Sequence, residues 1–464
     1  MIVVGIILGF FVAVMAFLTP KWAFYLFWPV TWCYPTSLLY GALPFNIRFD
    51  DLFMVWLTIA CLRVLPPDVL PSRSFRVALI WFLSITFGAM AGLLTSESYA
   101  IRAILRDIAK AMHVPMVALT TCALIRSERD TRSLLVVMAL GAAGSFAIGV
   151  LQVYRPDLTA FWEIPQTELG MDTESERHIE GGDTQIRAQG AVGGITLSIL
   201  GFSMALLGLR LALHDAGTMR KLGHSINGLA GLVGLGYTVT RGAMAGLAGA
   251  LFFSLFTQSK KGAALILIFA GAAITVSQTD VLERMTYRVA SKDSDLGSLE
   301  AGAAVRGQVW MTYLTEWSPH YFLFGRGFTA ELVRHQCTAH NTYIGALAYT
   351  GLFGVVALIW VVFMMMHTPL KLLRIEKDPF YLGLTEAFAA MVVAFMVNGL
   401  TAELWQQPQP IIFSLYALVD ARLRLHETAA TAMTALPSAW TPVHAGARRL
   451  PPPRPIRTVR VTLR

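Results

Sequence analysis

Three polar residues lie where apolar segments meet water, and their types suit chemistry on an anionic substrate. His340 and Arg241 each open an apolar segment, and Arg306 lies in a long polar loop between those two segments. The planar guanidinium of arginine matches the oxygens of a phosphate and keeps its charge at every ordinary pH. An imidazole can take or give a proton near pH 7, and nearby arginines disfavour its cationic form. The pattern predicts a general base beside a pyrophosphate-binding site.

A second group of cations lies along one predicted helix. Arg102, Arg106 and Lys110 follow one another at intervals of four residues, so they share a helix face that extends ~12 Å at ~1.5 Å per residue. Cations at that depth in a membrane cost roughly a few kcal/mol each unless they are paired or hydrated. Asp107 supplies one carboxylate for three cations. We therefore expect an anionic ligand beside Arg102 and Arg106.

These residues also have plain structural interpretations. A single arginine at a helix end commonly extends to lipid headgroups, and a histidine at a helix start is commonly a surface or capping residue. Arg306 could be an ordinary loop charge, and the tryptophans of its loop could form an interfacial belt. The adjacent Asp50 and Asp51 are a weaker candidate for a metal pair, because neighbouring side chains on a helix point about 100° apart.

The composition indicates which kind of structural element positions these residues. The chain has 464 residues, of which 55% are hydrophobic and 14% charged, and its mean hydropathy is +0.57. Soluble domains carry roughly 25% charged residues, so a soluble enzyme and a disordered regulator are excluded. The apolar residues come in blocks of about 17–25, long enough to cross a bilayer as helices. The net charge of +8 reflects basic cytoplasmic loops and not a nucleic-acid partner.

We predict an all-α, polytopic bundle of about 12–13 transmembrane helices in a single domain over residues 1–436. The count is 12 if the second segment, which Pro29 and Pro35 interrupt, does not span. The predicted segments are 2–18, 22–41, 50–65, 77–94, 103–125, 131–153, 188–212, 223–238, 240–257, 262–278, 339–366, 381–400 and 405–423. The basic, proline-rich tail 437–464 is predicted to be disordered and cytoplasmic.

Counting back from the tail places four short basic loops on the same, cytoplasmic side and two long loops on the other. The basic loops contain Arg126, Arg129 and Arg132; Arg220 and Lys221; Lys260 and Lys261; and Lys371, Arg374 and Lys377. The loop 154–187 has 8 acidic residues and 3 arginines, and the loop 279–338 is near neutral and rich in aromatic residues. We expect the second loop to fold back over the membrane surface as amphipathic helices that cap a cavity.

Three strings resemble one family. The string 340–354, which begins His-Asn-Thr-Tyr and carries spaced glycines, resembles the signature of the O-antigen ligase and polymerase superfamily. Thr-Arg-Gly-Ala at 240–243 is similar to that family's Ser-Arg-Gly-Ala helix start, with threonine in place of serine. Arg-Gly-Gln-Val-Trp at 306–310, followed by Phe-Gly-Arg-Gly-Phe at 324–328, is similar to its long-loop pattern. The three occur in order over about residues 188–366.

The resemblance implies a GT-C-like, metal-independent glycosyltransferase that needs no cofactor. It implies a glycan donor linked to undecaprenyl pyrophosphate, a hydroxyl acceptor on a polysaccharide repeat unit or lipid A-core, and a site at the periplasmic face of the bacterial inner membrane. Other membrane proteins of polysaccharide assembly would be partners. By motif match His340 would be the base and Arg241 and Arg306 the pyrophosphate ligands, with Arg102 and Arg106 as further candidates.

Other choices stay open at this point. Asn341, Tyr343 and Trp310 are candidate contacts to donor or acceptor. The sequence does not separate a ligase from a polymerase. A transporter or flippase of lipid-linked saccharides would also place basic residues in a cavity, and a metal-dependent transferase would use Asp50 or Asp51.

Overall fold

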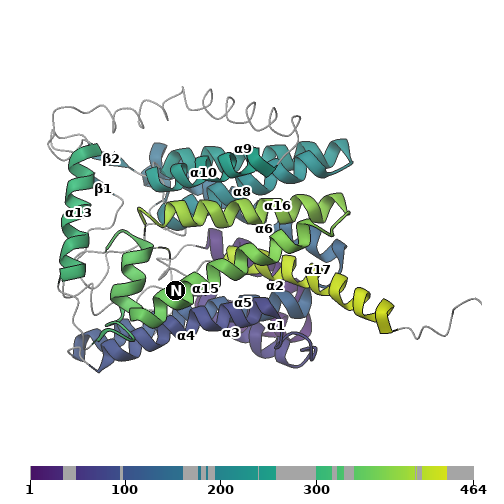
Figure 1. The fold of residues 1–464 in the computed structure, drawn as a ribbon, viewed down its shortest axis with the longest axis horizontal. Coiled ribbons are helices and arrows are strands. Elements are labelled where there is room, and N and C mark those ends of the chain that lie inside the picture. Colours follow the sequence, from purple (N-terminus) through teal and green to yellow (C-terminus); the bar gives the residue numbers. More distant parts are fainter. Residues whose placement is uncertain are drawn as a thin grey trace, which may run out of the picture. The chain divides into compact units, whose positions relative to one another are not determined.

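The computed structural model is built almost entirely of helices (Figure 1). It describes residues 2–34, 49–94, 98–159, 176–178, 184–186, 194–238, 240–257, 299–315, 321–328, 339–402, 404 and 410–435. The helices are α1 (Ile2–Leu18), α2 (Pro20–Cys33), α3 (Phe49–Leu62), α4 (Arg73–Leu93), α5 (Ser98–Leu124), α6 (Glu128–Tyr154), α7 (Pro156–Thr159), α8 (Gly194–His214), α9 (Thr218–Thr238), α10 (Arg241–Thr257), α13 (Leu299–Thr315), α15 (Thr342–Leu373), α16 (Pro379–Asn398) and α17 (Pro410–Ala435). Two strands, β1 (Glu176–His178) and β2 (Thr184–Ile186), form an antiparallel pair.

Five of the described helices are long and apolar enough to cross a membrane. They are α4, α6, α8 from Thr196 onward, α15 and α16. They indicate a multi-pass helical membrane protein, and the predicted all-α class holds for the described residues apart from the short β1–β2 pair.

The chain divides into two compact units, Met1–Leu423 and Arg424–Arg464. The division falls inside α17, upstream of the boundary predicted after residue 436. The predicted tail 437–464 lies outside the described residues. Everything described below belongs to the first unit.

Most predicted segments coincide with a helix to within a few residues. The predicted segment 22–41 is an exception, because α2 ends at Cys33 and residues 35–48 lie outside the described part. The predicted ends at 366 and 423 are also too early, because α15 continues to Leu373 and α17 to Ala435. The doubtful second segment is nevertheless a helix, with Pro20 in its first turn and Pro29 inside it. The predicted segment 262–278 lies outside the described residues.

Small residues let the helices of the first unit pack closely. α8 lies against α9, and a Cβ added to Gly208 would collide with the backbone of Gly228 on α9. A Cβ on Gly231 would likewise meet the backbone of Gly201 and Ala205 on α8. α16 packs against both α8 and α10, so these four helices form one layer of contacts (Figure 1). Close backbone approach of this kind is typical of helix pairs in membranes, where lipid gives no hydrophobic driving force.

Ion pairs join the helix ends that the sequence placed on the cytoplasmic side. Asp215, between α8 and α9, accepts a hydrogen bond from Arg132 of α6 at 3.0 Å and lies 3.5 Å from the Arg220 guanidinium. Arg422 of α17 forms a bidentate pair with Glu376, which precedes α16. The Arg132 guanidinium also lies 3.8 Å from the ring centroid of Phe380 on α16, so three of the four basic loops used to predict the topology share one end of the bundle. The fourth, at Lys260 and Lys261, lies outside the described residues.

The same end contains a buried charge cluster. Arg210 of α8 is 1% exposed, and its guanidinium lies 3.2 Å from the Glu386 carboxylate of α16. His214 lies 2.9 Å from the same carboxylate. Charges in a membrane interior persist only when they are paired, so this cluster fixes α8 against α16 near their basic ends.

The two long loops have structure that the sequence only partly predicted. The acidic loop 154–187 contains α7 and the β1–β2 pair, neither of which was expected. The aromatic loop 279–338 contains α13, so a helix in this loop is confirmed for residues 299–315. Apolar side chains of α13 are found on its exposed side as well as its buried side, because Met311 and Leu314 are 59% and 44% exposed whereas Tyr313 is buried. The amphipathic pattern of this helix is therefore weak.

The Asp215 carboxyl predicts a pH dependence of stability. Burial raises the pKa of this carboxyl, but hydrogen bonds from Arg132 and the Gly217 N–H outweigh burial and hold the pKa below its ordinary value. A carboxyl with a lowered folded-state pKa stabilises the fold at pH values above about 4 and loses that contribution on acidification. We expect Asp215→Asn to lower the unfolding free energy by about 1–3 kcal/mol at pH 7 and to flatten the acid side of the thermal midpoint profile.

Asp157→Asn is the matched control. Asp157 is also paired with an arginine, Arg155, at 2.9 Å, but both side chains are about 60% exposed. Exposed pairs contribute little, so this variant should unfold like the wild type. Equal midpoints for the Asp215 variant and the wild type from pH 4 to 7 would contradict the assignment.

Candidate functional site

His340 lies immediately before α15 in an uncommon backbone conformation. Its φ is +48°, the left-handed region that non-glycine residues rarely adopt. The preceding Ala339 is held on both sides, because its N–H donates to the Tyr349 hydroxyl at 3.0 Å and its carbonyl accepts from Trp310 Nε1 at 2.8 Å. Such conformations persist where neighbouring contacts fix them, and they concentrate at functional sites.

Asn341, the residue after His340, is the N-cap of α15. Its Oδ1 accepts hydrogen bonds from the N–H groups of Tyr343 and Ile344 at 2.9 and 3.1 Å. Its Nδ2 donates to the Leu400 carbonyl at 3.1 Å. The amide therefore accepts hydrogen bonds from two N–H groups that have no partner within the helix, and it also connects the start of α15 to the segment that follows α16.

Thr342 makes the strongest connection to that segment. Its N–H donates to the Gly399 carbonyl at 2.7 Å, and its hydroxyl donates to the Ala402 carbonyl at 2.7 Å. The same hydroxyl accepts from the Leu404 N–H at 2.9 Å. The start of α15 is thus bonded to the residues just after α16, and the backbone on either side of His340 is held in place.

The three residues predicted to contact donor or acceptor form hydrogen bonds within the protein. Asn341 caps α15, Trp310 bonds to Ala339, and the Tyr343 hydroxyl donates to the Met396 carbonyl at 2.8 Å. The bonds of Asn341 and Trp310 lie on the two sides of His340 in the chain, at its next residue and at Ala339. The sequence missed Thr342 and Tyr349, although a threonine directly after a capping asparagine could have suggested a buried role.

Arg241 and Arg306 are carried by elements that meet near His340. Arg241 is the first residue of α10, and a Cβ on the next residue, Gly242, would collide with the Thr401 hydroxyl. The start of α10 therefore packs against the same segment that holds Thr342. Arg306 lies on α13 one turn before Trp310. The side chains of both arginines lie outside the described part, so the structure describes their backbone positions alone.

The face of α5 that contains Arg102, Arg106 and Lys110 continues to a further titratable residue. The side chains of Arg102 and Arg106 lie outside the described part. His113 continues the same helix face, seven residues beyond Arg106, and is 6% exposed. Its Nε2 lies 2.9 Å from the Asp51 carboxylate of α3. This pair was missed, although the 7-residue spacing from Arg106 was visible in the sequence.

Asp51 is one of the two residues considered for a metal pair, and its carboxylate faces His113. Among the residues whose side chains are described, no group of three or more His, Cys, Asp or Glu could hold a metal ion. The side chain of Asp50 lies outside that part of the chain.

α15 is broken at Gly351, and the segment 321–328 fills the break. Gly351 has φ 63° and ψ −162°, which interrupts the helix. The N–H of Gly327 donates to the Tyr349 carbonyl at 2.8 Å, before the break. The N–H of Leu352 donates to the Phe322 carbonyl at 2.8 Å, after it. The polar backbone groups freed by the break are therefore bonded within the protein, as an apolar environment requires.

Glycines make this junction possible. Gly325 and Gly327 have φ of +67° and +78°, and a Cβ on Gly325 would collide with the Tyr349 backbone. A Cβ on Gly327 would lie 2.9 Å from the Gly88 carbonyl of α4. We call Gly88, Gly325, Gly327 and Gly351 the glycine lock. It explains the Phe-Gly-Arg-Gly-Phe string as a packing requirement.

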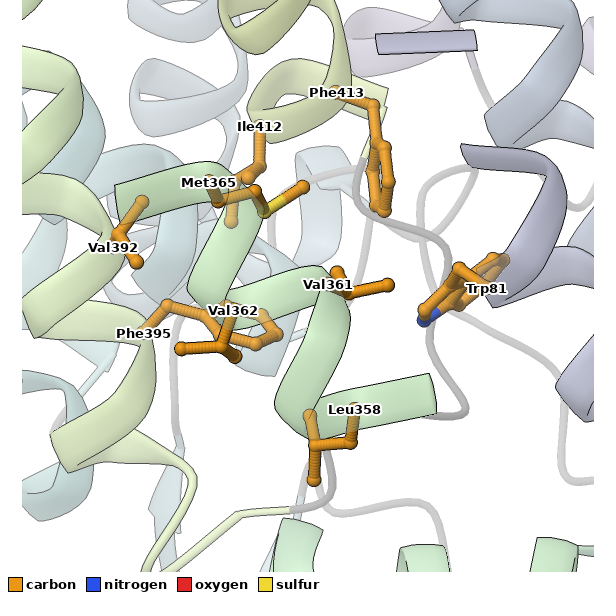
Figure 2. A pocket seen from close by; sticks show the side chains of 9 residues that line it. All are labelled: Trp81, Leu358, Val361, Val362, Met365, Val392, Phe395, Ile412 and Phe413. Atoms are coloured by element: carbon orange, nitrogen blue, oxygen red, sulfur yellow. The ribbon is translucent and has the colours of Figure 1, made fainter. Parts of the chain in front are cut away.

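An apolar cavity of about 20 Å³ lies deeper between α4, α15, α16 and α17. Figure 2 shows the side chains that line it. They are Trp81, Leu358, Val361, Val362, Met365, Val392, Phe395, Ile412 and Phe413. A cavity this small and apolar cannot hold a sugar or a phosphate, so it is a packing void and not the candidate site.

Comparison with models of known protein families finds no match, and comparison with curated proteins finds none either. The interpretation of the site therefore rests on its residues and their geometry.

The glycine lock predicts which substitutions disrupt the site. Gly325→Ala places a Cβ against backbone atoms at a positive φ, so we expect a loss of stability of at least about 1–2 kcal/mol, measured as a lower thermal midpoint. Gly223→Ala on α9 is the control, because nothing lies within 4 Å of the added Cβ. That control should unfold at or above the wild-type midpoint. Identical midpoints for Gly325→Ala and wild type would overturn the packing role.

Proposed function

We propose that the chain is an inverting, metal-independent glycosyltransferase that is similar to the O-antigen ligase and polymerase superfamily. In this proposal it has about 12–13 membrane helices in a GT-C-like arrangement and lies in the bacterial inner membrane. Its site faces the periplasm and takes glycan from undecaprenyl pyrophosphate. One observation carries the proposal: His340, at a positive φ, lies next to Ala339, which Trp310 of α13 bonds, and close to Thr342. Thr342 in turn bonds to Gly399, Ala402 and Leu404, and the start of α10 packs against Thr401 of the same segment.

The proposed chemistry is a single displacement. The His340 imidazole takes the proton of the acceptor hydroxyl, and the oxygen attacks the anomeric carbon of the donor glycan. The bond from that carbon to the pyrophosphate oxygen breaks, and the carrier leaves as the pyrophosphate. Arg241 and Arg306 stabilise the charge that grows on the leaving group, and Arg102 and Arg106 are further candidates for this role.

The local structure supports a base at this position. The bonds of Ala339, Asn341 and Thr342 fix the backbone on both sides of His340. A fixed backbone at His340 limits the positions that the imidazole can take, which favours proton transfer to it. Arg241 at the start of α10 and Arg306 on α13 would keep the imidazole neutral and able to accept a proton.

The proposal does not choose between a ligase and a polymerase. Both need the same base and the same anion site, and they differ in the acceptor. The product separates them, since a ligase adds one preassembled glycan to a lipid whereas a polymerase gives a ladder of repeat units by mass spectrometry.

A transporter of lipid-linked saccharides is the second candidate, and the break in α15 favours it. Broken helices near a binding site are a feature of transporters. Incubation of the purified protein with a lipid-pyrophosphate glycan and an acceptor distinguishes the two functions. A glycosyltransferase releases the carrier pyrophosphate, whereas a transporter leaves the donor intact. A transferase that depends on a metal at Asp50 or Asp51 would lose activity on addition of EDTA.

His340→Ala tests the base. General-base assistance is worth roughly 10²–10⁴ in rate, so we expect carrier release to fall by at least about 100-fold while the thermal midpoint stays near the wild-type value. His367→Ala, on the second half of α15, is the matched control and should keep full activity. Substantial product from His340→Ala would falsify the assignment.

Arg306→Lys tests the anion contact. Lysine keeps the charge but loses the planar fork, so a bidentate contact predicts a loss of roughly 10²–10³ in turnover. Arg220→Lys, at the opposite end of the bundle, should have no effect on turnover because Arg220 lies 57% exposed beside Asp215. If Arg306→Lys retains wild-type turnover, Arg306 acts through its charge alone or not at all.

A further inference from the structure

Asn398 is a buried amide that the proposed mechanism does not use. It is the last residue of α16, and its side chain is 0% exposed. Neither its Oδ1 nor its Nδ2 has a hydrogen-bond partner among the residues that the structure describes. Asn341, whose Nδ2 bonds to the Leu400 carbonyl, forms hydrogen bonds through both amide atoms, whereas Asn398 forms none among the described residues.

An amide buried in this way is costly unless something bonds to it. Burying an unpaired polar group opposes folding, and each such group in a native protein calls for an explanation. A leucine of nearly the same size would fill the position without that penalty. The amide at Asn398 therefore points to a contact outside the protein's own packing.

The amide faces the first turn of α10. The ideal Cβ position of Gly242 lies 2.7 Å from Asn398 Oδ1, so the absence of a side chain at Gly242 brings the amide against the helix start. In that turn the N–H groups of Ala243 and Met244 bond to the Thr240 carbonyl. The N–H groups of the two residues before them have no partner within the helix by its geometry.

The start of a helix of this length favours an anion. Its unpaired N–H groups point outward and the helix dipole places partial positive charge there. An amide Nδ2 adds a further donor, and rotation of the amide by half a turn exchanges Nδ2 with Oδ1 at no cost in shape. Arg241 is the first residue of the same helix, so a fixed charge belongs to the same turn.

We propose that Asn398 and the first turn of α10 form a phosphate-binding subsite, with the Asn398 Nδ2 and the N–H groups of Arg241 and Gly242 as donors. The proposal rests on the proposed function for the identity of the anion, a phosphate of the donor pyrophosphate. It assigns Gly242 a purpose as well, because a side chain there would displace the amide.

The test is binding of inorganic pyrophosphate to the purified full-length protein by titration calorimetry, with the thermal midpoint measured in parallel. Asn398→Leu should weaken binding by at least about tenfold, since it removes a hydrogen bond to a charged group. Its midpoint should equal or exceed that of the wild type, because the unpaired amide is gone. A merely structural amide predicts the reverse, with a lower midpoint and unchanged binding, and that result would overturn the subsite.

Two further variants complete the design. Asn227→Leu on α9 is the matched control, because Asn227 contacts Met204 at 3.7 Å away from this site, and it should bind pyrophosphate like the wild type. Asn398→Asp keeps the size but adds a negative charge, so it should weaken binding further than leucine does. If the leucine variant is not recovered folded, wild-type binding by Asn398→Asp overturns the proposal on its own.

The outcomes separate the subsite from the enzyme. If wild-type protein transfers no glycan but binds pyrophosphate in a way that depends on Asn398, the subsite stands and the glycosyltransferase proposal fails. If wild-type protein transfers glycan and Asn398→Leu binds and transfers equally well, the subsite fails and the enzyme proposal stands.

Discussion

The arrangement of the candidate site depends on the requirement that backbone polar groups be bonded where water is excluded. Residues 399–402 and 404, after α16, meet that requirement by bonding to the start of α15. The Gly399 and Ala402 carbonyls accept from Thr342, and the Leu404 N–H donates to it. The start of α10 packs against the same segment at Gly242 and Thr401. Because one short segment serves both helices, the backbones of Arg241 and His340 are held near each other.

The break in α15 extends this constraint to the segment 321–328, which lies between α13 and α15 in the chain. Gly351 releases backbone groups that the segment 321–328 then bonds, and Tyr349, just before the break, also bonds to Ala339. The first part of α15, the loop and α13 are therefore connected. The rest of α15, after the break, packs against α4 and α16.

The two ends of the first unit use charge differently. At the basic end Arg132, Asp215, Glu376 and Arg422 pair with one another across helices and give stability. At the other end the backbone around His340 is held by neutral hydrogen bonds from amides and hydroxyls. The buried amide of Asn398, which has no hydrogen-bond partner among the described residues, belongs to this second end.

The sequence by itself determined the helical membrane class, most helix positions and the shared end of the described basic loops, because apolar length and charge placement are local properties. It also singled out His340 and the elements that carry Arg241 and Arg306. Only the tertiary structure decided that Asn341, Tyr343 and Trp310 bond within the protein, that Gly351 breaks α15, and that His113 meets Asp51. Those facts depend on contacts between residues far apart in the chain, and residue type and spacing along one segment do not specify them.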